Sequence, residues 1–120
     1  MNVLVVEDEA LVAMIAEEAL SSLGFQTSSA RNAQEALEQF EALAPSLAVI
    51  DVGLPDLRGD ELAERLRAMA PDLPIVVASG YDEAELKARF SHDPKIAVVA
   101  KPYTEDDLAR ATRALGFAHA

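Results

Sequence analysis

Five short apolar runs alternate along the chain with segments of helical periodicity, and this alternation restricts the fold more than any other feature. Four of the runs are rich in Val, Ile, Leu and Ala without polar alternation, which is typical of strands covered on both faces. The second run is more polar and suits an edge strand. The runs are Val3–Val6, Phe25–Ser29, Leu47–Asp51, Ile75–Ser79 and Ile96–Ala100. They start roughly 20 to 30 residues apart, the spacing of βαβ units, which predicts a parallel sheet.

Between the runs, apolar residues recur three and four positions apart, as on one face of an amphipathic helix. The residues that carry this pattern are Leu11, Ile15, Ala19 and Leu23 (with Val12, Ala16 and Leu20 alongside), Ala33, Ala36, Leu37, Phe40 and Leu43, then Leu62, Leu66 and Met69, and finally Leu108, Ala111 and Leu115. The pattern is weakest over Asp82–Phe90. Gly116 is a suitable helix stop. The sequence therefore predicts one α/β domain that spans residues 1–120.

Composition excludes several classes of function. The chain lacks cysteine, which excludes disulfides, thiolate metal sites and thiol catalysis. Its net charge is −11, and such a surface repels nucleic-acid phosphates and anionic lipid, so we expect binding to neither nucleic acid nor membrane. The apolar runs are far shorter than the roughly 20 residues that cross a bilayer. Because the first residues also lack the features of a signal peptide, we expect a cytoplasmic protein.

Four of the apolar runs each deliver polar side chains at their carboxyl end. Glu7 and Asp8 follow the first run, Asp51 closes the third, Ser79 closes the fourth, and Lys101 follows the fifth. In an open parallel sheet, ligands bind beyond the carboxyl ends of the strands. We therefore predict that these side chains meet at one edge of the sheet and form the functional site.

Each of these residues also has a purely structural interpretation. Asp8 is a favoured helix N-cap, and Asp51 alone is an ordinary strand-end aspartate. Ser79 could be a turn residue before Gly80, and a lone lysine such as Lys101 is most often solvated. The functional interpretation depends on the coincidence of all of them at one edge.

The charges in this group indicate a metal ion. Three carboxylates, those of Glu7, Asp8 and Asp51, face a single lysine, and like charges this close favour an intervening cation. Oxygen ligands suit Mg²⁺ and its waters better than an all-protein calcium cage. A His or Cys cluster for zinc or copper is missing, and we assign no role to His92 or His119.

With Mg²⁺ bound, Asp51 would be an ionised carboxylate that attacks phosphorus and forms an acyl phosphate. Mg²⁺ and Lys101 would neutralise charge on the equatorial oxygens, and the Ser79 hydroxyl would donate to another of them. The new phosphoryl group brings a charge of about −1.5 to −2, enough to draw Ser79 and Lys101 inward. We expect a phosphoacceptor and not an enzyme with a separate substrate.

Four short segments resemble the motifs of the receiver domains of two-component signalling, and the resemblance covers essentially the whole chain. They are Val5–Glu9 (the acidic metal turn), Asp51–Gly59 (the phosphorylation-site loop), Val77–Gly80 (the Ser/Thr turn) and Ala100–Tyr103 (the lysine-proline turn). Each segment alone is a weak signal, whereas four in this order and at this spacing are specific. Flavodoxin, P-loop NTPase, haloacid-dehalogenase and Rossmann motifs are absent from the sequence.

The resemblance implies a flavodoxin-like (βα)5 doubly wound fold with five parallel strands in the order 2-1-3-4-5. It implies phosphotransfer to Asp51 from a sensor histidine kinase or a histidine phosphotransfer protein. It also implies that Asp8, Asp51 and the Gly53 carbonyl bind Mg²⁺, with Glu7 acting through water.

One departure from the family concerns activation. Most receivers have an aromatic residue in the fifth strand, three residues before the lysine, and this chain has Val98 there. Aromatic residues stand instead at Tyr81 and Tyr103, which resembles a smaller branch of often single-domain receivers. We expect Tyr81 and the stretch 82–94 to carry the conformational response; the alternative is that both tyrosines only pack near the surface.

The sequence leaves the output of the protein open. With no residues left over for an output domain, we expect a phosphorelay carrier, a phosphate sink or a regulator that binds a protein partner when phosphorylated, as a monomer or weak homodimer. The alternative is a docking module that binds a kinase without being phosphorylated. Because Gly53 offers no side chain to position water and Tyr81 could shield the site, we expect slow loss of the phosphoryl group.

Overall fold

The computed structural model describes residues 1–117 and contains five strands and five helices in strict alternation. The strands are β1 (Asn2–Val6), β2 (Gln26–Ala30), β3 (Leu47–Asp51), β4 (Ile75–Ser79) and β5 (Ile96–Ala100). The helices are α1 (Ala10–Ser22), α2 (Ala33–Leu43), α3 (Gly59–Met69), α4 (Glu83–Arg89) and α5 (Glu105–Ala114). All strand pairs are parallel and the order is β2-β1-β3-β4-β5, which confirms the predicted fold.

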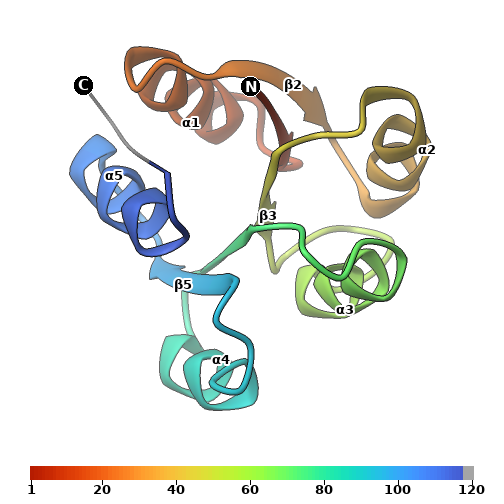
Figure 1. Ribbon diagram of the computed structural model, residues 1–120, viewed down its shortest axis with the longest axis vertical. Helices are drawn as coiled ribbons and strands as arrows, with labels where there is room; N and C mark the ends of the chain where they lie inside the picture. Colours follow the sequence, from red (N-terminus) through yellow and green to blue (C-terminus); the bar gives the residue numbers. More distant parts are fainter. Residues whose placement is uncertain (118–120) are drawn as a thin grey trace.

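The sheet forms the middle of three layers (Figure 1). Helices α1 and α5 cover one face, and α2, α3 and α4 cover the other. This sorting follows from right-handed βαβ crossovers in a sheet whose order reverses between β1 and β3. That reversal opens a crevice at the carboxyl ends of β1 and β3, which is where the sequence places its acidic residues.

Alternate residues of each strand build two separate cores. On one face Leu4, Ile50 and Val77 contact α2, α3 and α4, and on the other Val5 and Val49 contact α1 and α5. The central strands β3 and β4 are buried along their whole length. This explains why they contain almost no polar residues until their last position, which is Asp51 in β3 and Ser79 in β4.

Two predictions from periodicity need correction. Strand β2 lies one residue later than the predicted run, and Phe25 precedes it in the core. In α1 the buried residues are Ala13, Ala16, Ala19 and Leu20, whereas Leu11 and Ile15 are half or more exposed. Since the first two turns of α1 are apolar all round, three alanines and Leu20 pack against the sheet, and Leu11 and Ile15 face outward.

The remaining helices follow the sequence signals more closely. The weak pattern over 82–90 forms only the seven-residue α4, and Met69 at the end of α3 is exposed. Gly116 follows the end of α5 with a φ of 100°, a left-handed conformation that suits glycine as a helix stop. No helix in the described part of the chain has the length and apolar character to cross a membrane.

The loop after β3 is tied to the start of α2 by one carboxylate. Asp56 accepts hydrogen bonds from the backbone N–H groups of Ala33 (2.9 Å) and Gln34 (3.0 Å), which are unpaired donors in the first turn of α2. These bonds, the Ala33 one foremost, hold the pKa of Asp56 below its ordinary value of 3.8. The ionised carboxylate therefore stabilises the folded loop.

Asp56→Asn should lower the urea midpoint at pH 7, because the amide lacks the charge that the helix terminus favours. The pKa of Asp56 is depressed on folding, so its contribution is complete above its ordinary value of 3.8 and is lost as pH falls through the folded pKa. The difference between variant and parent should therefore shrink below about pH 4. Urea titrations between pH 7 and pH 3 measure it, with the exposed Asp72→Asn as control. A difference that stays constant with pH would contradict this role of the charge.

Candidate functional site

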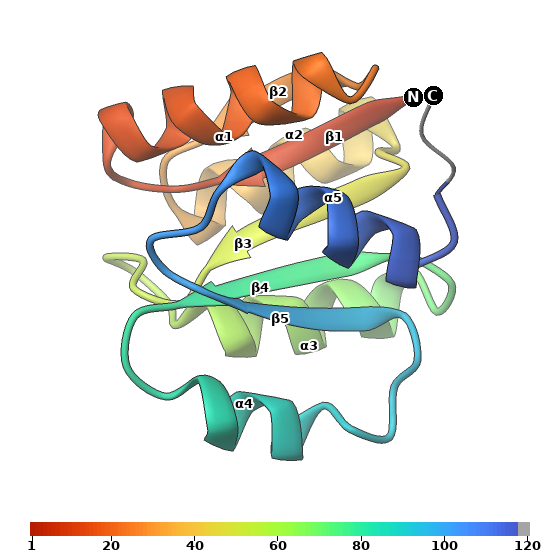
Figure 2. The same cartoon turned by 90° about the vertical axis from the view of Figure 1, so that its left-hand side faces the viewer.

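Backbone hydrogen bonds continue the sheet one residue past several strand ends and so fix the first residues of the loops. The N–H of Glu7 donates to the carbonyl of Ala30 (3.0 Å), and the N–H of Lys101 donates to that of Ser79 (2.8 Å). Figure 2 shows the loops that leave the strands together at one edge of the sheet. The predicted site residues therefore start from main-chain positions that the rigid sheet sets.

Three carboxylates meet at this edge. Glu7, Asp8 and Asp51 each offer an oxygen atom, and these oxygens all lie within 4.8 Å of one another. Glu7 and Asp51 are buried, at 3% and 8% exposure, while Asp8 is exposed. A half-open cluster of carboxylate oxygens fits Mg²⁺, which keeps several water ligands.

Lys101 joins two of these carboxylates. Its ammonium donates to Oε1 of Glu7 (3.0 Å) and to Oδ1 of Asp51 (3.1 Å), and its side chain is 19% exposed. The interpretation of Lys101 as a solvated loop lysine is therefore wrong. The lysine therefore places a positive charge directly beside the Asp51 carboxylate.

Burial and charge shift the titration of the groups around Lys101. Burial raises the pKa of Glu7 to about 7, against the lowering effect of its hydrogen bonds from Lys101 and from the Glu9 N–H. Burial alone would lower the pKa of Lys101, but its bonds to Glu7 and Asp51 outweigh this and hold it above its ordinary value. One lysine cannot balance three carboxylates, so the cluster favours an additional cation.

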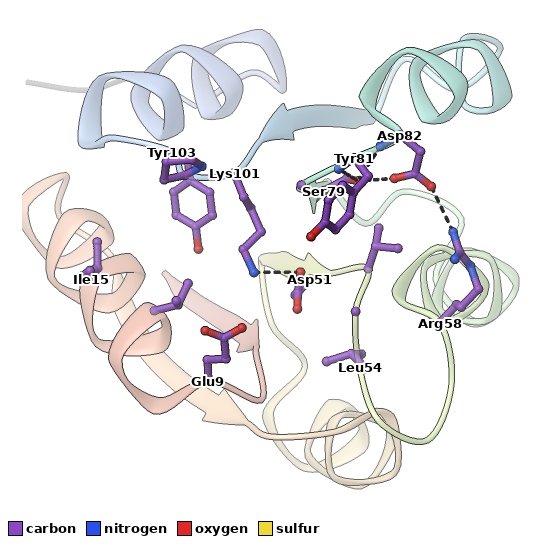
Figure 3. A pocket seen from close by; sticks show the side chains of 15 residues that line it. Glu9, Ile15, Asp51, Leu54, Arg58, Ser79, Tyr81, Asp82, Lys101 and Tyr103 are labelled. Atoms are coloured by element: carbon purple, nitrogen blue, oxygen red, sulfur yellow. Dashed lines mark hydrogen bonds and ion pairs between the residues drawn. The ribbon is translucent and has the colours of Figure 1, made fainter.

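The Ser79 hydroxyl is buried and belongs to the turn after β4. It donates to Oδ1 of Asp82 and accepts from the N–H groups of Tyr81 and Asp82, both at 3.3 Å. The structural interpretation of Ser79 as a turn residue thus describes its contacts here. Asp82 in turn receives a bond from the Arg58 guanidinium (3.2 Å), as Figure 3 shows.

Two glycines shape the loop after Asp51. A Cβ on Gly59 would lie 2.0 Å from the carbonyl oxygen of Asp51, so the start of α3 packs directly on the backbone of Asp51. The N–H of Gly59 donates to the carbonyl of Val52 (2.9 Å). The backbone of Gly53 lies beside the Asp51 carboxylate, since a Cβ on Gly53 would lie 3.5 Å from Oδ2 of Asp51.

A cleft of about 810 Å³ opens above Asp51. Its walls include Val12 and Ile15 of α1, Tyr103, and Tyr81 on the opposite side (Figure 3). The two tyrosines differ in environment. Tyr103 packs against the core beneath α1 and α5, and burial raises its pKa to about 12. Tyr81 is fully exposed at the rim.

The structure brings together every site residue predicted from strand ends. Asp8 does not cap α1, because the N-cap is Glu9 and has no side-chain cap bond. Val98 is half-buried in the edge strand β5. His92 lies in the loop before β5, and His119 lies outside the described residues.

Sequence analysis did not identify Arg58 and Asp82 as part of the site. Asp82 had one usable signal, since Ser79 and Asp82 have the spacing of a serine-capped turn. Arg58 had none, because Asp82, the residue that it binds at the cleft, lies 24 residues away in the sequence.

Comparison with known proteins identifies a family and several relatives that match most of the chain. The family model described as "Response regulator receiver domain" matches residues 3–113. The chain is 34% identical over 110 residues to the sensor kinase CckA of Brucella abortus, covering 90% of this chain and 12% of that protein. It is 22% identical to sporulation initiation phosphotransferase F of Bacillus subtilis, covering 93% of this chain and 90% of that one.

Solved structures share this fold closely. The receiver domain of NtrX from Brucella abortus superimposes with a TM-score of 0.84 at 29% identity, covering 97% of this chain and 99% of that one. The chain spans less than half the length of several curated relatives, which contain further segments.

Proposed function

The chain belongs to the response regulator receiver domain family, and we propose that Asp51 is its phosphoacceptor, loaded from a sensor histidine kinase or a histidine phosphotransfer protein. One observation carries the proposal. The Asp51 carboxylate lies at the floor of an open cleft, 3.1 Å from the Lys101 ammonium and beside the oxygens of Glu7 and Asp8. This arrangement suits an anionic nucleophile that must approach an anionic phosphoryl group.

The proposed step transfers one phosphoryl group. An Oδ atom of Asp51 forms a bond to phosphorus while the N–P bond of a phosphohistidine breaks, and the imidazole leaves with the electron pair of that bond. Lys101 faces the oxygens of the transferred group with its positive charge. The product is an acyl phosphate on Asp51, which adds about −1.5 to −2 charge at the cleft.

Mg²⁺ is the cofactor that we propose for this site. Asp8 and Asp51 would hold it directly together with the Gly53 carbonyl, and Glu7 would act through water. The bound ion would supply positive charge that neutralises the phosphoryl oxygens in the transition state. The half-open cluster of hard oxygen donors supports this choice.

Labelling with a small phosphodonor such as acetyl phosphate tests the proposal without a kinase. With Mg²⁺ we expect base-labile label on Asp51, and with excess chelator at least about tenfold less, because three carboxylates then repel the donor. Glu85→Ala, which removes one exposed carboxylate of α4 that does not belong to the cluster, should label like the parent. Labelling at the parental rate in chelator would contradict the metal assignment. Complete absence of label would favour a docking module that is never phosphorylated.

The output is a separate part of the proposal. We propose contact with a protein partner, phosphorelay transfer or phosphate-sink action by a monomer or weak homodimer in the cytoplasm, and no enzymatic turnover of a separate substrate. Tyr81 supports a contact role, because it is fully exposed beside the cleft. We propose Ser79, Tyr81 and Tyr103 as the residues that respond to phosphorylation in place of an aromatic residue at Val98.

A further inference from the structure

The Ser79 hydroxyl forms its hydrogen bonds within the turn after β4. It is 3% exposed, and it donates its proton to Asp82, which lies at the entrance to α4. A hydroxyl group has a single proton to donate. It therefore cannot donate to Asp82 and to a phosphoryl oxygen on Asp51 at the same time.

The second oxygen of the Asp82 carboxylate also has a hydrogen-bond partner. The Arg58 guanidinium binds Oδ2 at 3.2 Å while Oδ1 accepts from Ser79, so each oxygen of Asp82 has a partner. The hydrogen bond from Ser79 and the bond from Arg58 keep the pKa of Asp82 below its ordinary value. Asp82 is therefore an ionised acceptor at neutral pH, and charge-assisted hydrogen bonds of this kind are the stronger ones.

Arg58 is itself oriented by a buried group. Its Nε lies 3.0 Å from Oδ1 of Asp60, whose side chain is only 3% exposed and also pairs with Arg89 of α4. Arg58 precedes Gly59, the residue that packs on the Asp51 backbone. The three residues Ser79, Asp82 and Arg58 thus connect the turn after β4 to the loop after β3, as the dashed lines in Figure 3 show.

We propose that Asp82 and Arg58 are positioning residues that hold the Ser79 hydroxyl in a latch, which phosphorylation of Asp51 must open. The proposal rests on the proposed function, since the competing acceptor is the phosphoryl group. Before phosphorylation, the Ser79 hydroxyl donates its single proton in a hydrogen bond to Asp82. After phosphorylation, Ser79 donates that proton to a phosphoryl oxygen. Asp82 then keeps its bond from Arg58 but loses the bond from Ser79, and the start of the short helix α4 is free to move.

The latch predicts that Asp82→Ala strengthens binding of beryllofluoride, a noncovalent mimic of the phosphoryl group, in the presence of Mg²⁺. We expect about fivefold tighter binding, the size of one ordinary hydrogen bond that no longer has to be broken. Titrations of ¹⁵N-labelled protein followed by NMR give the affinities. Arg58→Gln should act in the same direction with a smaller factor, because Asp82 then loses its orientation but keeps its bond from Ser79.

Removing Asp82 also removes a negative charge near an anion, so the test needs a cycle with Ser79→Ala. In that background the latch does not exist, and we expect Asp82→Ala to change the affinity less than about twofold. Equal factors in the two backgrounds would show that Asp82 acts through charge alone and would overturn the latch. Weaker binding by Asp82→Ala in the parent background would also overturn it.

Two controls separate this result from other failures. Glu85→Ala removes the same charge from the exposed face of α4 and should leave the affinity unchanged. If the parent protein binds neither Mg²⁺ with beryllofluoride nor phosphoryl label, the proposed function itself fails and the latch fails with it. If the parent binds both and the cycle shows no coupling, only the latch is wrong.

Discussion

Asp51→Asn protein should take up essentially no phosphoryl label, at least about 100-fold less than the parent under the same conditions. The amide that replaces the carboxylate has no anionic oxygen to attack phosphorus, and it cannot form an acyl phosphate. Acetyl phosphate in the presence of Mg²⁺, followed by phosphate-affinity electrophoresis or mass spectrometry of the intact protein, measures the loss. The same variant tests transfer from any candidate histidine kinase.

A folded variant is essential to this experiment. Asparagine has nearly the shape of aspartate, and Lys101 keeps its bond to Glu7 at 3.0 Å. Removing one of three clustered carboxylates also relieves repulsion, so the thermal midpoint should stay at or above that of the parent. The exposed Asp72→Asn provides the matched control and should label fully. Base-labile label at parental levels in Asp51→Asn protein would place the acceptor elsewhere and contradict the assignment.

The central strands and the candidate site could be predicted from the sequence because burial restricts which residues these strands contain. Strands β3 and β4 are covered on both faces, so polar residues are confined to their ends, and Asp51 and Ser79 stand out for that reason. The predicted bounds of β3, β4 and β5 coincide with those of the structure. Parallel strands then bring their ends to one edge, which needs no knowledge of side-chain contacts.

The sequence predicts the buried face of a helix less well where the helix is apolar on every side. The predicted pattern in α1 contains Leu11 and Ile15 as well as Ala16, Ala19 and Leu20, and periodicity alone does not separate the exposed pair from the buried residues. The buried face of the helix consists of three alanines and Leu20. Which face of α1 packs on the sheet depends on the distance between the helix and the sheet. The local sequence pattern carries no information about that distance.

Contacts between loops were beyond sequence analysis for a related reason. Arg58 and Asp82 belong to different loops, and their pairing depends on how α3 and α4 leave the sheet. The Asp56 cap of α2 likewise joins residues 23 and 22 positions apart. A charged residue in a loop is most often exposed, and only the three-dimensional arrangement identifies those that form specific hydrogen bonds.

The role of Gly59 also became clear only in three dimensions, and it leads to the second large effect. Gly59→Ala should destabilise the fold by about 3 kcal/mol or more, the upper range for overpacking a tight site. The added Cβ would lie 2.0 Å from the carbonyl oxygen and 2.7 Å from the carbonyl carbon of Asp51. These are backbone atoms, so no side-chain rotation can relieve the clash. Either α3 or the end of β3 must move.

Urea unfolding measures this loss, and Gly80→Ala is its matched control. A Cβ on Gly80 meets no atom within 4 Å, so that variant should keep its stability or gain up to about 1 kcal/mol from a less flexible unfolded chain. Because the displaced backbone is that of the proposed acceptor, Asp51, the folded fraction of Gly59→Ala should also label more slowly than the parent. A Gly59→Ala protein with parental midpoint and labelling rate would contradict the close packing of α3 on Asp51. Normal labelling at reduced stability would instead mean that α3 moves while Asp51 keeps its place beside Lys101.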